Sequence, residues 1–170
     1  TAYDHMFLDG LEDAYEEGRA MGTFAQETAN EYQLTREQMD DYSIESLRRA
    51  NAAIDSGAFA DEIAAVTFTT RKGEVTVDTD EAPGRGNPDK IPQLRPAFAK
   101  DGTITAATSS SISDGAAALV LSRESVAKEN GQEAVAKIVA MAAHAQEPSE
   151  FTVAPIGAIE KVLSEAGWSA

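Results

Sequence analysis

The sequence of 170 residues contains no cysteine. Disulfide bonds, thiolate metal sites and a cysteine nucleophile are therefore excluded within this chain. Positive charge is also scarce, because 14 Lys and Arg residues stand against 29 Asp and Glu residues and give a formal net charge of −15. This balance argues against non-specific binding to nucleic acid and against docking on an anionic membrane. It still permits an anionic ligand, which a few local Arg and Lys side chains can bind.

Long apolar runs are missing too, since none approaches the ~20 residues of a membrane-spanning helix. No signal peptide is visible, and the first residue is Thr rather than Met. We therefore expect a cytoplasmic protein. No G-x-S-x-G, P-loop, dinucleotide or zinc-protease motif is present, and nothing orients His5 or His144 toward a nucleophile. The hydrophobic content of 42% nevertheless suffices for a core, in one domain or in parts of two.

Apolar residues at helical spacing predict two helices in the first third of the chain. The first covers residues 21–32. The second covers residues 36–56, because Thr35-Arg-Glu-Gln38 has the pattern of a capping box and Gly57 is placed to end the helix.

Two further helices are expected toward the C-terminus. Ser122 can cap a helix that runs to about residue 130 and stops at Gly131. The last helix has Pro155 in its first turn and ends at Gly167.

Strands are predicted in four places. Residues 62–70 and 75–77 form a hairpin that turns at Lys72-Gly73. The unbroken apolar run Ala116–Leu121 is typical of a strand buried on both faces, and residues 136–142 alternate enough for another.

Small and hydroxylated side chains fill residues 105–113, at the entrance to the expected buried strand. Such side chains let another molecule approach the backbone and offer it hydrogen bonds. The alternative is a polar turn that only leads into a core strand.

Two charged loops allow more than one interpretation. Arg85, Lys90 and Arg95 lie in a Pro- and Gly-rich stretch that is either a solvated loop or a mobile loop that meets phosphate groups. Asp78, Asp80 and Glu81 are followed by Pro83-Gly84 instead of a calcium-loop pattern, which favours an acidic surface turn over a metal site.

Eight segments in succession resemble the middle of a thiolase (acetyl-CoA acetyltransferase). These segments are Asp9-Gly-Leu-Glu-Asp-Ala-Tyr15, Met21-Gly-Thr-Phe-Ala-Gln26, Thr35-Arg-Glu-Gln-Met-Asp40, Arg71-Lys-Gly73, Leu94-Arg-Pro-Ala-Phe98, Asp101-Gly-Thr-Ile-Thr-Ala106, Ser113-Asp-Gly-Ala-Ala-Ala118 and Ala166-Gly-Trp168. Their order and spacing hold over essentially all of the chain, which covers less than half of a typical family member.

The resemblance implies an α/β fold of the thiolase type, with a helix-rich inserted lid and incomplete pieces of two layered α/β halves. Residues 1–102 correspond to the lid (loop) domain. Residues 103–131 correspond to the end of the N-terminal half, and residues 132–170 to the start of the C-terminal half.

The resemblance also implies which residues hold coenzyme A or acyl-CoA, the family's substrates, with no tightly bound cofactor and no metal. Ser110 corresponds to the serine that lines the pantetheine tunnel. Arg85 is the candidate for the adenine nucleotide end, and Phe151 matches an apolar position near the substrate. The other positions against the coenzyme are Ala106, Ile112, Ala97, Phe98, Leu11 and Met21.

Two departures from the family pattern affect the expected tunnel. Ala20 stands where many acetoacetyl-type thiolases have a His, and the turn before Met21 has one extra residue. The family's Gly-Asn-Ala-Ser-Gly is Ala107-Thr-Ser-Ser-Ser111 here, which keeps the small, polar character but adds hydroxyls.

In thiolases one cysteine takes up the acyl group, a second moves protons, and Asn-His groups form an oxyanion hole. By resemblance, the first cysteine lies before Thr1, and the second cysteine and the Gly-His-Pro histidine lie after Ala170. We therefore expect no catalytic residue and no activity in this chain alone. The parent enzyme would condense or cleave acyl-CoA thioesters, as in fatty acid metabolism. Alternatives are a non-catalytic CoA-binding or assembly module and a thiolase-like lipid carrier.

The expected partners are the rest of the thiolase polypeptide and other copies in a homodimer or homotetramer. If residues 103–170 are pieces of two sheets, their apolar faces need partners that the chain lacks. We expect the stretch 116–121 and the helix face of Ile156, Ile159 and Leu163 to be exposed or to pair with another copy.

Overall fold

A computed structural model describes residues 2–170. The chain divides into two compact units, and the boundary between them falls inside a helix. One unit holds the residues up to Phe24 together with Ser111–Ala170, and the other holds Ala25–Ser110. The expected lid of residues 1–102 and the two partial halves concern the intact protein, and that division stays a prediction.

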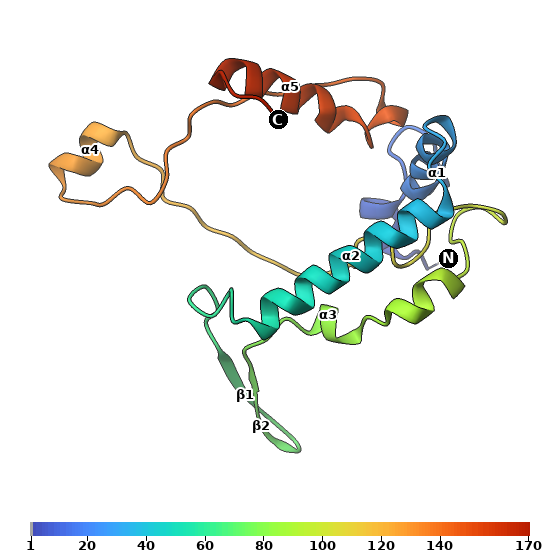
Figure 1. The fold of residues 1–170 in the computed structure, drawn as a ribbon, viewed down its shortest axis with the longest axis horizontal. Helices are drawn as coiled ribbons and strands as arrows, with labels where there is room; N and C mark the ends of the chain where they lie inside the picture. Colours follow the sequence, from blue (N-terminus) through green and yellow to red (C-terminus); the bar gives the residue numbers. More distant parts are fainter. Residues whose placement is uncertain (1) are drawn as a thin grey trace. The chain divides into compact units, whose positions relative to one another are not determined.

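The unit Ala25–Ser110 is built on helix α2 (Arg36–Asp55), drawn in Figure 1. Its start at the capping box is confirmed. The Thr35 hydroxyl accepts a hydrogen bond from the N–H of Gln38 at 3.2 Å, and the Gln38 side chain accepts one from the N–H of Thr35 at 2.9 Å. Gly57 follows the helix with φ of 69°, a left-handed conformation that ends it as expected.

Shorter elements accompany α2. Helix α1 (Met21–Glu31) confirms the first predicted helix. Helix α3 (Glu81–Arg85) and the 3-10 helix η2 (Pro88–Gln93) both contact α2 (Figure 1). Asp80 caps α3, since its carboxylate accepts the N–H of Ala82 at 3.0 Å. The acidic turn therefore has a structural use.

The predicted hairpin is confirmed as the antiparallel pair β1 (Val66–Thr70) and β2 (Gly73–Val77). Phe68 faces Val75 in its register, and the hydroxyls of Thr67 and Thr76 lie 2.8 Å apart. The two faces therefore differ, one apolar and one hydroxylated.

The other unit contains the π-helix η1 (Phe7–Leu11), helix α4 (Glu124–Glu129), the 3-10 helix η3 (Pro148–Glu150) and helix α5 (Ala154–Ala166). Helix α5 is confirmed, with Pro155 in its first turn and Gly167 at its end. The cap predicted for α4 is wrong. Ser122 donates its hydroxyl to the carbonyl of Arg123 at 3.2 Å instead of accepting an amide of the helix.

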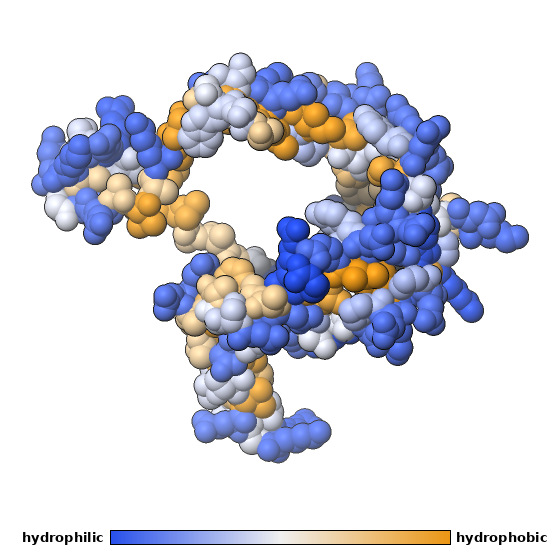
Figure 2. Space-filling model, in the orientation of Figure 1, coloured by the Kyte–Doolittle hydropathy of each residue, from blue (hydrophilic) through white to orange (hydrophobic). Residues whose placement is uncertain are grey.

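The two strands expected at 116–121 and 136–142 are also wrong, because both stretches are irregular. A doubly buried strand needs neighbours on its edges and faces, and within residues 2–170 only β1 and β2 form a sheet. Leu119 and Val120 are 86% and 95% exposed, and Figure 2 shows apolar residues open to solvent on the stretch before α4. Ile156 and Ile159 are exposed on α5 as well. The expectation of uncovered apolar surface is confirmed for residues 116–121 and for these two isoleucines, whereas Leu163, expected to be exposed with them, is half-buried.

The buried residues include several polar side chains. The apolar ones are Phe24, Ala29, Ile91 and Ile104, and the polar ones are Gln26, Asp40 and Thr105. Along the described part of the chain, no helix combines the length and apolar character needed to cross a membrane.

Candidate functional site

The turn that leads into the serine stretch is closed by a backbone bond. The N–H of Ala97 donates to the carbonyl of Ile104 at 2.9 Å. Three candidate coenzyme contacts, Ala97, Phe98 and Ala106, therefore lie at or next to one closed turn.

Gln26 of α1 holds this turn in place. Its buried carbonyl accepts the N–H groups of Thr103 at 2.8 Å and Ile104 at 3.2 Å, while its amide donates to the Thr103 hydroxyl at 3.2 Å. Gly102 permits this approach, because a Cβ there would lie 2.5 Å from the Gln26 carbonyl oxygen. The entrance to the serine stretch is thus fixed by one buried amide.

Side-chain hydroxyls close the next turn, and one serine hydroxyl takes no part in these hydrogen bonds. Thr105 is fully buried, its N–H donates to the Thr108 hydroxyl at 2.9 Å, and its carbonyl accepts the Ser109 hydroxyl at 2.9 Å. Ser111 lies 3.2 Å from another serine hydroxyl. Ser110 is exposed and makes no side-chain hydrogen bond within the described residues. Ser110 is therefore the hydroxyl of this run that remains available to a ligand.

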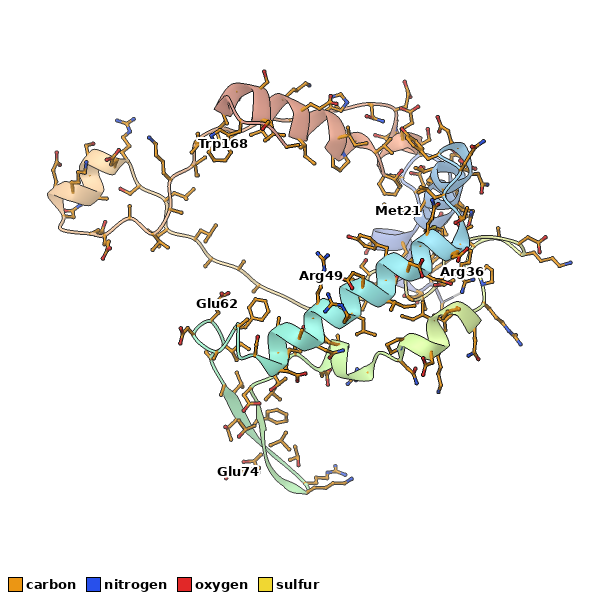
Figure 3. The ribbon with its side chains drawn as sticks, in the orientation of Figure 1. Met21, Arg36, Arg49, Glu62, Glu74 and Trp168 are labelled. Carbon is orange, nitrogen blue, oxygen red and sulfur yellow. The ribbon has the colours of Figure 1, made fainter. Side chains whose placement is uncertain are left out.

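A second polar anchor fixes the segment just before Ala97. The guanidinium of Arg36 bonds both carboxylate oxygens of Asp40, at 2.9 and 2.8 Å, and Asp40 is only 4% exposed. The same guanidinium donates to the carbonyls of Ile91 at 3.0 Å and Leu94 at 2.9 Å. Figure 3 labels Arg36 near the start of α2. Asp40 thus orients the group that ties η2 to α2.

Sequence reasoning missed Gln26, Arg36 and Asp40 as anchors. All three lay in segments that carried the resemblance. One signal was the spacing of Arg36 and Asp40, which are one helical turn apart. The other was the side-chain amide of Gln26, which lies one turn before buried Ala29 on an apolar helix face.

Arg85 lies away from these turns, at the last turn of α3. Its guanidinium pairs with Glu81 at 2.6 Å, and its side chain is 73% exposed. An exposed pair of this kind is weak, so Arg85 could exchange Glu81 for an anionic ligand. The solvated and phosphate-binding interpretations of this loop both stay open.

In the other unit, an isolated antiparallel bridge pairs Glu12 with Ala20. The N–H of Asp13 also donates to the carbonyl of Arg19 at 2.8 Å, which closes the loop between them. Leu11 precedes Glu12 and Met21 follows Ala20, so both lie next to the bridge and outside the loop that it closes. Two candidates ten residues apart in sequence are thereby brought to one place, and Ala20 sits at the bridge itself.

Phe151, the candidate near the substrate, packs against α1. Its ring lies 6.2 Å from that of Phe24, centroid to centroid, with the planes 80° apart. The Arg19 guanidinium lies over the Phe24 ring, 3.6 Å from its centroid. Contacts of these two kinds each contribute about 0.5–1.5 kcal/mol. Ile112, by contrast, is exposed.

The histidines do not complete a hydrolytic site. His5 faces Asp9 at 3.8 Å, and His144 lies 3.1 Å from the Gln146 side chain and 3.2 Å from the Lys161 ammonium. Neither ring bonds a serine hydroxyl in the described structure, so no serine is activated. Among residues 2–170 no three acidic or imidazole groups gather as metal ligands.

Comparison with known proteins places these residues in a family. Residues 1–125 match the thiolase N-terminal domain. The chain is 46% identical to a mitochondrial acetyl-CoA acetyltransferase of Gibberella zeae and 46% identical to an acetyl-CoA acetyltransferase of Yarrowia lipolytica, over 96% of its own length in both cases. It spans only 39% and 41% of those relatives.

Solved structures agree. An acetyl-CoA acetyltransferase of Bacillus anthracis matches 94% of this chain and 40% of its own, with a TM-score of 0.84 and 38% identity. A human mitochondrial 3-ketoacyl-CoA thiolase matches 98% of this chain and 42% of its own, with a TM-score of 0.87 and 32% identity. These likenesses confirm the expected fold class, a partial α/β fold of the thiolase type. The chain belongs to the thiolase family.

Proposed function

We propose that the chain is the coenzyme A-binding central portion of an acetyl-CoA C-acyltransferase, a thiolase that condenses or cleaves acyl-CoA thioesters through a cysteine acyl-enzyme. The 46% identity to acetyl-CoA acetyltransferases over 96% of the chain carries this proposal. The chain has no cysteine of its own, so we propose that it is inactive without the rest of the polypeptide. Assembly of the parent protein as a homodimer or homotetramer belongs to the same proposal.

Within the unit Ala25–Ser110, we propose that Ser110 contacts the pantetheine of coenzyme A. Its exposed, unbonded hydroxyl next to a hydrogen-bonded turn supports this role. Ala106, Ala97 and Phe98 would supply the small and apolar contacts beside it, and Arg85 would meet the nucleotide end.

Within the other unit, Leu11 and Met21 are proposed as apolar pantetheine contacts, supported by the bridge that brings them together. Ile112 would join them, and Phe151 would face the acyl group. The cytoplasmic location stays a prediction, since relatives with mitochondrial names are among those that match.

A paired measurement tests this function. The full protein that contains this chain should cleave acetoacetyl-CoA in the presence of coenzyme A, and the 170-residue chain should not. In the full protein, Ser110→Trp should weaken coenzyme A binding in a calorimetric titration, because the indole fills the space beside the turn. Ser56→Trp, at the exposed end of α2 in the same unit, is the matched control.

The inactivity of the isolated chain, the role of Ser110 and the activity of the full protein can each be contradicted separately. Thiolysis by the isolated chain contradicts its proposed inactivity. Unchanged coenzyme A affinity in Ser110→Trp removes this residue from the site. Coenzyme A binding by a full protein that shows no thioester cleavage would support the non-catalytic binding module instead.

A further inference from the structure

The contact between Phe24 and Phe151 joins two segments of one unit that are far apart in sequence. Phe24 is 1% exposed and stands in the first turn of α1, whereas Phe151 is 37% exposed and follows η3. One ring is thus part of the core, and the other reaches the surface while resting on it. A buried ring that supports a partly exposed one can fix its orientation.

Arg19 fixes the buried ring in turn. Both oxygens of the Glu16 carboxylate accept its guanidinium at 2.8 Å, and the Thr23 hydroxyl accepts its Nε at 3.1 Å. The guanidinium is thereby held over Phe24, with its central carbon 3.6 Å from the ring centroid. Nη1 donates to both Glu16 oxygens and Nε donates to Thr23, so two nitrogens of the guanidinium are held at once.

The backbone under Phe151 is fixed as well. The Gln146 amide donates to the carbonyl of Glu150 at 3.2 Å and to its carboxylate at 3.0 Å. The N–H of Phe151 closes the 3-10 turn on the carbonyl of Pro148 at 3.3 Å. With the backbone held and Phe24 on one side, the Phe151 ring has few orientations left.

From this chain of contacts we infer that Phe24 and Arg19 are positioning residues that hold Phe151 as a fixed wall and so limit the length of the acyl group that the enzyme accepts. The inference rests on the proposed function, in which Phe151 faces the acyl group. Loss of the Phe24 ring would free Phe151 to turn into the vacated space. Longer acyl chains would then fit, while the shortest substrate would change little.

The test uses the full protein and two substrates, 3-oxoacyl-CoA thioesters with short and medium acyl chains. The readout is the ratio of kcat/KM for the medium chain to that for the short chain. We expect the ratio to rise on the order of tenfold in Phe24→Leu and in Phe151→Leu. Arg19→Met should raise it by about threefold, because the ring stays but its support is lost. Phe59→Leu and Arg49→Met are the matched controls.

A double-mutant cycle separates positioning from general packing. If Phe24 acts through Phe151, then Phe24→Leu adds nothing to the ratio once Phe151→Leu is present. A purely structural role would lower the melting temperature and the activity toward both substrates together, and would leave the ratio unchanged. That unchanged ratio overturns the inference.

The outcomes also distinguish failure of the proposed function from failure of the positioning role of Phe24 and Arg19. A wild-type full protein without thiolase activity overturns the proposed function and this inference with it. An active wild type with unchanged ratios in the variants overturns this inference alone. If Phe24→Leu does not fold, Arg19→Met and its cycle with Phe151→Leu decide the question, since the Arg19 side chain is partly exposed.

Discussion

The unit Ala25–Ser110 and the segment 111–143 differ in how their groups find partners. In the unit, buried polar groups such as Gln26 and Asp40 bond to backbone or side chains of the same unit. In the segment, apolar side chains such as Leu119 and Val120 lie open to solvent. The first region carries its own stabilising contacts within a short stretch of chain. The second has the apolar residues typical of a core, but they are not buried.

This difference shows what each region contributes. The anchored unit presents the turn before Ser110 in one conformation, because buried, fully bonded polar groups are costly to disrupt. The apolar segment contributes hydrophobic stabilisation only when other apolar surface covers it. Variants in the anchored unit should therefore change stability strongly.

The largest effect is expected at the ion pair of α2. Asp40→Ala leaves the Arg36 guanidinium without its carboxylate, and because the Arg36 side chain is 26% exposed we expect a loss of about 3 kcal/mol, the lower end of the range for breaking a buried pair. Urea unfolding followed by circular dichroism measures the loss. Asp41→Ala, one residue along on the exposed side, should cost no more than about 0.5 kcal/mol. Equal costs for the two variants would contradict the anchoring role.

A smaller effect is expected at the amide that holds the turn. Gln26→Leu keeps the volume but removes the acceptor for the N–H groups of Thr103 and Ile104. Unsatisfied buried donors cost about 1–3 kcal/mol. The same unfolding measurement applies, with exposed Gln132→Leu as control. A stabilised Gln26→Leu would show that the turn does not depend on this amide.

The smallest effect concerns the surface of α2. Hydrogen bonds from Arg48 and then Arg49 lower the pKa of Glu45 from 4.5 to about 2. A lowered pKa means that the unfolded chain takes up the proton first, so the contribution of Glu45 to stability is complete above pH 4.5 and is lost as the pH falls toward 2. The effect is small, because solvent screens an exposed pair.

Glu45→Gln should therefore be less stable than wild type at pH 7, and the difference should shrink as the pH falls through 2. Glu62→Gln is the control, since Glu62 makes no side-chain hydrogen bond or ion pair in the described part of the chain (Figure 3). A difference between Glu45→Gln and wild type that persists unchanged down to pH 2 would show that the pair does not titrate as stated.

Local signals in the sequence predicted the helices and the hairpin well. The capping box at Thr35, the turn at Lys72-Gly73 and the helix end at Gly167 depend on neighbouring residues only, and the structure confirms each. The strand expected at Ala116–Leu121 failed because a buried strand depends on distant partners. Its apolar composition predicts that the stretch is buried, but it does not identify the segments that cover it.

The candidate site shows the same limit. Resemblance suggested Leu11 and Met21, but only the bridge between Glu12 and Ala20 shows that the backbone brings these two residues close to each other. The run of hydroxyls did not reveal that Thr108 and Ser109 bond Thr105 and leave Ser110 available. These pairings depend on backbone geometry, which no single residue type specifies.

Hydrogen exchange tests the contrast between the two regions most directly. In the 170-residue chain at dilute, monomeric concentration, we expect amides of residues 116–121 to exchange as fast as those of an unfolded peptide, while amides within α2 are protected. In the full protein the same amides of residues 116–121 should become protected. Strong protection of residues 116–121 in the isolated monomeric chain, or their fast exchange in the full protein, would contradict the account.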